Sequence, residues 1–234
     1  MLVTTLALVL APQAACGVTA HGTPPGLPEI GRRLAVEGDL MVTVGPQSVP
    51  PSIVTIWRWS LDGWAFEDSA VAPVDPYAFA GSVAIVDGDV FVATTDPING
   101  AEINIFSASN GSWSLGQTIW PFQSYIYGSI ADVDVVSRNG EAFFGNTWNG
   151  RLERLERSSG GAWTHSLVAS HSGWPSGYGQ SLDFDTEWMV VGAFGSSPSV
   201  LVYPRSGPSL GAPITLLSSL GVNSFGLEVA LDDN

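Results

Sequence analysis

The chain has 234 residues, of which 22 are acidic and 8 are basic, and its formal net charge is −14 at pH 7. All the basic residues are Arg, and 45% of the residues are hydrophobic. This composition excludes a disordered acidic tail, which lacks apolar area to bury. It also disfavours nucleic-acid binding, because that binding depends on basic residues that neutralise phosphates.

The N-terminal residues have the pattern of an export signal. Residues 2–11 form an uncharged apolar run, and small residues follow around positions 18–20. The run has signal-peptide length and is too short to span a bilayer. We therefore predict a signal peptide or apolar leader over 1–20, a linker over 21–29, no transmembrane span, and a secreted or cell-surface protein. A lipid anchor on Cys16, the only cysteine, and an apolar strand in this region are the alternatives.

An internal repeat of about 49 residues covers the rest of the chain. Its first marker is an aromatic residue followed by Gly or Ala, as in Tyr178-Gly179. Its second marker is a Trp after a Gly-containing turn, at Trp64, Trp113 and Trp163. Because these Trp residues recur with the repeat, we predict that they lie in the core. The repeats run over 30–78, 79–126, 127–177 and 178–224, with a partial copy over 225–234.

Each repeat reads as four short strands. The turn between the first two strands contains Asp87-Gly88 in the second repeat and Asn139-Gly140 in the third, pairs that are typical of two-residue hairpins with positive φ. Residues 151–157 consist of good helix formers, but they occupy the place of a third strand. The repeat register therefore predicts a strand there, and it predicts the first strand of a fifth unit over 225–231.

Four-stranded units at this spacing predict an all-β fold, a β-propeller with about four blades and part of a fifth over residues 30–234. The segments around Tyr178-Gly179, 190–193 and 200–203 resemble the FG-GAP repeat, which builds the integrin α-subunit propeller and many secreted bacterial proteins. That resemblance implies more blades than the chain carries. We therefore expect an incomplete propeller, either continued by further blades or closed by leader residues or oligomerisation.

The resemblance also implies a calcium loop between the first two strands of some repeats. Calcium needs six to eight oxygen ligands, whereas these loops are cut down to hairpin turns in this chain. The one longer version contains Asp132 and Asp134 alternating with Val, which is more typical of a strand. We therefore predict no metal and no other cofactor.

Aromatic residues on the predicted loops provide the functional hypothesis. We expect Trp120, Tyr125, Trp148 and Trp174 to form a ligand-binding face, whereas Tyr178 is expected to be a structural wedge between blades. Exposed aromatic residues favour recognition of a protein or a glycan.

No linear catalytic motif is present, and His165 is expected to be an ordinary strand residue. We therefore predict a non-enzymatic binding or adhesion module. A secreted propeller enzyme acting on polysaccharide and a structural segment of a larger surface protein are the alternatives.

Overall fold

The computed structural model describes residues 33–45, 53–71, 79–96, 100–122, 133–147, 150–171, 177–193, 198–218 and 225–231. The leader, the linker, Tyr125, Trp148 and Trp174 lie outside these ranges. No described residue belongs to a helix long and apolar enough to cross a membrane. The described elements are all strands: β1 Arg33–Glu37, β2 Leu40–Val44, β3 Ile53–Ser60, β4 Gly63–Val71, β5 Phe79–Val86, β6 Asp89–Asp96, β7 Gly100–Ser109, β8 Ser112–Phe122, β9 Val133–Arg138, β10 Glu141–Asn146, β11 Arg151–Arg157, β12 Trp163–Ser170, β13 Tyr178–Phe184, β14 Trp188–Ala193, β15 Ser199–Ser206, β16 Ser209–Leu210 and β17 Ile214–Leu217.

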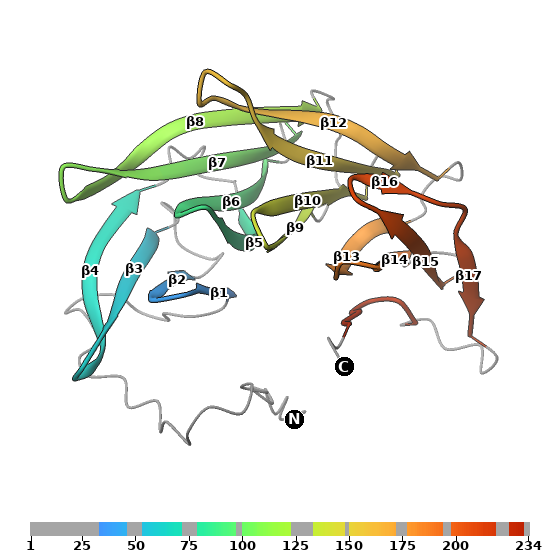
Figure 1. Cartoon of the computed structure of the whole chain (residues 1–234), viewed down its shortest axis with the longest axis horizontal. Helices are drawn as coiled ribbons and strands as arrows, with labels where there is room; N and C mark the ends of the chain where they lie inside the picture. Colours follow the sequence, from blue (N-terminus) through green and yellow to red (C-terminus); the bar gives the residue numbers. More distant parts are fainter. Residues whose placement is uncertain are drawn as a thin grey trace.

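The strands form four antiparallel sheets, which confirms the predicted propeller blades. Blades 1, 2 and 3 have the orders β1-β2-β3-β4, β5-β6-β7-β8 and β9-β10-β11-β12. Blade 4 contains β13-β14-β15, and both β16 and β17 pair with β15. The first strands β1, β5, β9 and β13 contact one another in sequence, so the blades spread around them as an open fan (Figure 1). Among the described residues the ring is not closed.

The hairpin turns have the conformation that their sequences predict. At Asp87-Gly88 the φ angles are 51° and 78°, and at Asn139-Gly140 they are 54° and 76°. Two consecutive positive φ angles match the right-handed twist of the two strands that the turn joins. In blades 2 and 3 these turns therefore place the second strand directly beside the first.

The segment rich in helix formers is a strand, as the repeat register predicts. Strand β11 pairs with β10 on one side and with β12 on the other. Leu152, Glu153 and Leu155 are buried in it, whereas its terminal Arg residues are exposed. Burial between two blades outweighs the helix propensity of this segment, because propensity differences are only about 0.7 kcal/mol per residue or less for ordinary residues.

The core lies between successive blades. Trp113 and Trp163 are 6% and 4% exposed and belong to the clusters between blades 1 and 2 and between blades 2 and 3. The prediction that they are core residues is confirmed. Trp64, at the same position of blade 1, is only partly buried and packs edge-on against Trp59. Its prediction as a core residue is therefore wrong, because no described blade precedes blade 1.

The Gly of the repeat marker allows neighbouring blades to approach closely. Gly179 has a φ of 88°, and a Cβ atom added to Gly145 of the preceding blade would lie 2.1 Å from the Gly179 carbonyl oxygen. Gly226 and Gly192 make the same approach, again at 2.1 Å. Backbone therefore packs directly on backbone at these two junctions, and a side chain would separate the blades.

The partial fifth repeat begins as predicted but is not a paired strand. Residues 225–231 form turns and bends followed by irregular backbone without a β ladder. The backbone N–H groups of Val229 and Leu231 donate hydrogen bonds to Ser181 Oγ at 3.0 Å and Asp183 Oδ2 at 2.7 Å. Side chains of β13 thus hold this segment beside blade 4, and the predicted strand is corrected to that extent.

Candidate functional site

Only one of the four predicted ligand-binding aromatic residues is described. Trp120 is 43% exposed, but it lies within β8 and not on a loop. The gathering of Trp120 with Tyr125, Trp148 and Trp174 on one face therefore stays a prediction. Tyr178, in contrast, is buried as predicted for a structural wedge.

The surroundings of Tyr178 are those of a packed core residue. Its hydroxyl lies 2.8 Å from the hydroxyl of Tyr203, and its ring stacks on His171 with the centroids 5.7 Å apart. Burial raises the pKa of both Tyr178 and Tyr203 above the ordinary value. Both phenols therefore stay neutral and hold β13 to β15.

Four equivalent positions near the start of the first strands form a polar group that we call the inner-strand ring: Arg33, Ser82, Asp134 and Ser181. Arg33, Ser82 and Asp134 pair with Val44, Ala93 and Gly145, which are equivalent positions of the second strands. Ser181 directly precedes Leu182, which pairs with Val191. Because the first strands lie together in the fan, these side chains lie near its axis.

Three members of the inner-strand ring join one blade to the next. Val135 N donates to Ser82 Oγ at 2.7 Å, and Val229 N donates to Ser181 Oγ at 3.0 Å. Leu182 N donates in the same way to Asp134 Oδ2 at 3.0 Å. A serine hydroxyl is thus sufficient for this link in blades 2 and 4, and Asp134 places a carboxylate where a neutral group would serve.

The pKa of Asp134 differs from that of an ordinary carboxyl group. Burial raises the pKa of Asp134 from 3.8 to about 6, although the backbone N–H of Leu182, the charge of Arg33 and the Ser82 hydroxyl each lower it. A carboxyl group with this pKa exchanges a proton near neutral pH, as general acids and bases require. Asp134 was expected to be a strand residue, and no motif in the sequence reveals that burial and the charge of Arg33 act on it together.

His165 and Glu153 form a second polar contact that the sequence did not predict. The Nδ1 atom of His165 hydrogen-bonds to Oε2 of Glu153, whose side chain is only 3% exposed. Among the described residues, Oε1 of Glu153 has no hydrogen-bond partner. His165 lies on a strand, as predicted, and its ring is 6.1 Å from that of Phe144. The sequence did not indicate Glu153, because it gave no reason to pair two residues on neighbouring strands.

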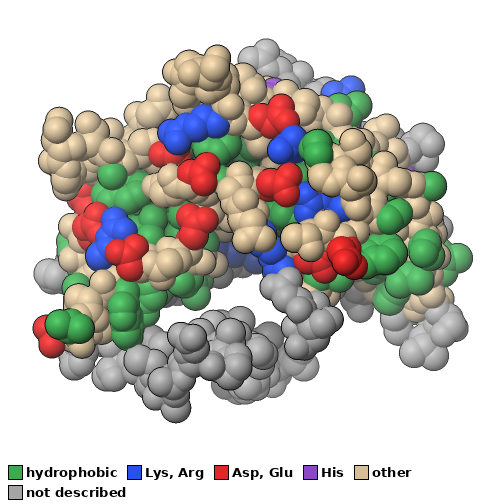
Figure 2. Space-filling view, viewed as in Figure 1, with side chains coloured by type: hydrophobic (Ala, Val, Ile, Leu, Met, Phe, Trp, Pro, Cys, Tyr) green, Lys and Arg blue, Asp and Glu red, His purple; other side chains and the backbone are tan. Residues whose placement is uncertain are grey.

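Other acidic residues serve as links between blades. Asp89 is buried and accepts hydrogen bonds from Trp163 Nε1 and Arg157, both at 2.8 Å. Glu141 accepts from Arg205 of the next blade at 2.7 Å. On the face seen in Figure 2, acidic and Arg side chains lie beside one another. These carboxylates are satisfied by cations and donors and are therefore structural.

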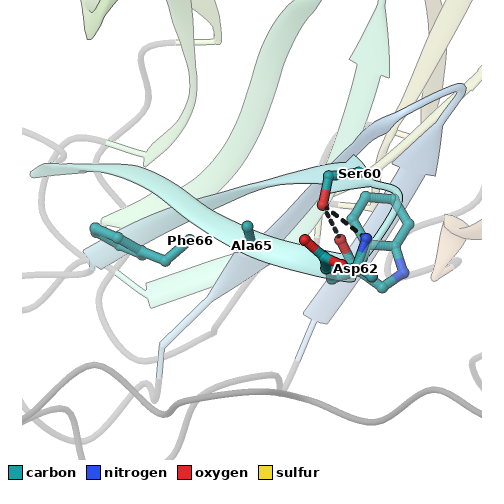
Figure 3. A pocket seen from close by; sticks show the side chains of 6 residues that line it. Ser60, Asp62, Ala65 and Phe66 are labelled. Carbon is teal, nitrogen blue, oxygen red and sulfur yellow. Dashed lines mark hydrogen bonds between the residues drawn. The ribbon is translucent and has the colours of Figure 1, made fainter.

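A shallow pocket lies at the hairpin that joins β3 and β4. It has a volume of about 480 Å³ and is lined by Ser60, Asp62, Gly63, Trp64, Ala65 and Phe66. The Ser60 hydroxyl donates to the carbonyl of Gly63 and accepts from the backbone of Asp62, which holds the turn (Figure 3). The pocket belongs to the outer strands of blade 1, whereas the inner-strand ring belongs to the first strands.

The described residues contain no group of three or more His, Cys, Asp and Glu side chains arranged to hold a metal ion. The expectation that the protein works without calcium stays a prediction, because this finding covers only the part of the chain that the structure describes. Asp134 and Arg33 give the inner-strand ring one acidic and one basic side chain.

No family model matches the sequence, and no curated protein matches it. Solved structures do resemble the fold. A provisionally assigned 6-phosphogluconolactonase from Bacteroides uniformis is 14% identical with a TM-score of 0.62, over 80% of this chain and 57% of its own. A protein from Lactobacillus plantarum is 15% identical with a TM-score of 0.55, over 80% and 55%. A prolyl endopeptidase structure is 15% identical with a TM-score of 0.52, over 81% and 28%.

These similarities correct the prediction of function. The main prediction, a non-enzymatic binding or adhesion module, is wrong, because structures of this architecture bear the names of a lactonase and a prolyl endopeptidase. The alternative, a propeller enzyme, fits better. The prediction depended on the absence of a catalytic motif in a short stretch of sequence. In this fold, groups that meet come from different blades and are about 50 residues apart, as Asp134 and Leu182 are, so a short motif does not reveal them.

At these identities the similarity establishes the fold alone, and the chain spans little more than half of the length of the first two structures. The four sheets, their radial order and the solved structures agree on one architecture. The described residues of the chain form an open array of four β-propeller blades.

Proposed function

We propose that the protein is a β-propeller hydrolase that acts on a carbohydrate-derived ester or lactone, with Asp134 as its general base. One observation carries this proposal: Asp134 is a carboxylate with a pKa of about 6 at a position where Ser82 and Ser181 make the same interblade link. A strongly shifted pKa without a structural need is typical of functional sites. The name of the Bacteroides uniformis structure supports the substrate class.

The chemistry requires only groups of the inner-strand ring. The ionised Asp134 removes a proton from water as the water attacks the ester carbonyl carbon. The positive charge of Arg33, which acts on Asp134, favours the oxyanion that forms. The carbon–oxygen bond then breaks, and the protonated Asp134 returns the proton to the leaving alcohol oxygen. A lactone suits this site better than a glycosidic bond, because glycosidases generally use two carboxylates and the ring contains one.

The test is hydrolysis of D-glucono-1,5-lactone by the purified chain, measured in a pH-stat against the spontaneous rate. We expect a rate that increases with pH around 6 and that falls at least about 100-fold in Asp134→Asn. Asp183→Asn is the matched control. Asp183, like Asp134, accepts a hydrogen bond from a backbone N–H of the following repeat, but it lies outside the inner-strand ring. Equal rates for the wild type and Asp134→Asn, or no rate above the spontaneous one, would refute the proposal. A parallel assay with 4-nitrophenyl glycosides tests the polysaccharide alternative.

We also propose that the repeats are of the FG-GAP type and that the protein is secreted or lies at the cell surface. The close approach of Gly179 to Gly145 gives the Gly of the aromatic-Gly marker a physical role and supports the first proposal. The uncharged apolar run over residues 2–11 supports the second. Sequencing the mature N-terminus of the secreted protein tests the predicted leader.

A further inference from the structure

The hairpin turn between β7 and β8 carries a sequence pattern that its geometry does not explain. Asn110 and Gly111 form this two-residue turn, and Ser109 pairs with Ser112 on either side of it. The φ angles of Asn110 and Gly111 are 55° and 79°, so the turn itself needs Asn-Gly or a similar pair. With Ser112, however, the turn becomes Asn110-Gly111-Ser112, which is the Asn-x-Ser/Thr pattern of an N-glycosylation acceptor.

Asn110 is the one Asn of the sequence that lies in this pattern. None of the other Asn residues is followed two positions later by Ser or Thr. Asn139-Gly140 forms a turn with nearly the same φ angles, 54° and 76°, yet Glu141 follows it. A turn of this type therefore does not need Ser at the third position.

The turn is open to solvent on the outside of the fan. Asn110, Gly111 and Ser112 are all exposed, and a Cβ atom added to Gly111 would have no neighbour within 4 Å among the described residues. At Gly140, in contrast, the added Cβ would lie 3.2 Å from Asp87 Oδ1 of the preceding blade. Strands β7 and β8 are the outer strands of blade 2, and their hairpin projects at the edge of the fan (Figure 1). A bulky group on Asn110 thus has room outside the blades.

We propose that Asn110 is an N-glycosylation site, with an oligosaccharide linked through pyrophosphate to a polyprenyl lipid as the second substrate. The side-chain nitrogen of Asn110 forms a bond to C1 of the first sugar. The bond between C1 and the pyrophosphate oxygen breaks, the lipid pyrophosphate leaves, and the amide nitrogen loses one proton. The inference rests on the proposed export of the protein, because this pattern is used on the surface of secreted chains.

The test is incubation of the purified whole chain with a single-subunit oligosaccharyltransferase and a polyprenyl-pyrophosphate-linked oligosaccharide, followed by mass spectrometry. We expect one glycan per chain on Asn110, and complete loss of it in Asn110→Asp and in Ser112→Ala. Ser112→Thr should keep the glycan, because Thr also satisfies the pattern. The turn should tolerate Asn110→Asp, since Asp87 has a φ of 51° in the Asp-Gly turn of the same blade. Circular dichroism of each variant establishes that its sheets are intact.

Three outcomes would overturn the proposal. The first is a wild-type chain that stays unmodified while a synthetic peptide of residues 107–114 is modified in the same mixture, which shows that the folded hairpin is not an acceptor. The second is a peptide of residues 107–114 that also stays unmodified while an established acceptor peptide reacts. The third is a glycan that persists in Asn110→Asp or in Ser112→Ala. None of these outcomes depends on export of the chain or on hydrolysis at Asp134.

Discussion

Replacement of Asp134 by Asn separates the stability of the fan from its proposed chemistry. The amide oxygen of Asn still accepts the hydrogen bond from Leu182 N, which the carboxylate accepts at 3.0 Å. The substitution removes the negative charge that burial disfavours. We therefore expect the variant to fold, to be more stable than the wild type above pH 6, and to be inactive.

The magnitude follows from the pKa of Asp134. A rise from 3.8 to about 6 corresponds to about 3 kcal/mol, since one pKa unit is about 1.4 kcal/mol. Because the folded state binds this proton more tightly than the unfolded state, the wild type gains stability as the pH falls through 6 and has the full gain below 3.8. The advantage of Asp134→Asn is therefore about 3 kcal/mol at pH 8 and close to zero near the unfolded pKa.

The assay is urea unfolding followed by Trp fluorescence at several pH values. In thermal unfolding, the same advantage of about 3 kcal/mol at pH 8 corresponds to an increase in Tm of roughly 6 to 12 °C for a domain of this size. Asp183→Asn, the control, keeps an amide oxygen that accepts from Leu231 N and loses only the ion pair with Arg138 at 3.7 Å, so it should be slightly less stable than the wild type. An Asp134→Asn variant that is less stable than the wild type at pH 8, or whose advantage does not change with pH, would refute this reasoning.

Three further predictions concern the blade junctions and the turns. Gly145→Ala should destabilise the fan by more than about 3 kcal/mol in urea unfolding, because the new Cβ would lie 2.1 Å from the Gly179 carbonyl oxygen. The control is Gly116→Ala, whose new Cβ would lie 3.6 Å from its nearest neighbour, and it should cost about 1 kcal/mol or less. Trp163→Phe should cost about 1 to 3 kcal/mol, because Asp89 loses the indole donor at 2.8 Å, and an unchanged unfolding midpoint would contradict that role. Calcium in place of a chelator should leave the Tm unchanged, because two-residue turns such as Asp87-Gly88 supply too few oxygen ligands, and a large rise in Tm would show that prediction to be wrong.

The candidate site was largely inaccessible to sequence analysis. Asp134 was correctly placed on a strand, but its significance depends on Ser82, Leu182 and Arg33, which lie on three other strands. The His165 and Glu153 pair likewise forms across two strands. Sequence periodicity identifies positions along the chain, and it does not indicate which polar side chains meet across different strands.

The amino-acid sequence alone determined the blades. The period of about 49 residues sets where each blade begins. Hairpin pairs such as Asn139-Gly140 set the turns through local geometry, and the recurring Trp113 and Trp163 mark the same core position in successive blades. These signals were strong enough to place residues 151–157 in a strand despite their helix propensity.

Only the tertiary structure decided what the equivalent positions do. Trp64 and Trp113 occupy the same place in their repeats, yet only Trp113 is buried, since burial depends on a neighbouring blade. Asp134 and Ser82 each accept a hydrogen bond from a backbone N–H of the next blade. Only Asp134 has an ionisable carboxyl group, and the surrounding blades shift its pKa. Exposure and electrostatics are sums over neighbours that are distant in sequence, and the packing of the blades alone determines which neighbours those are.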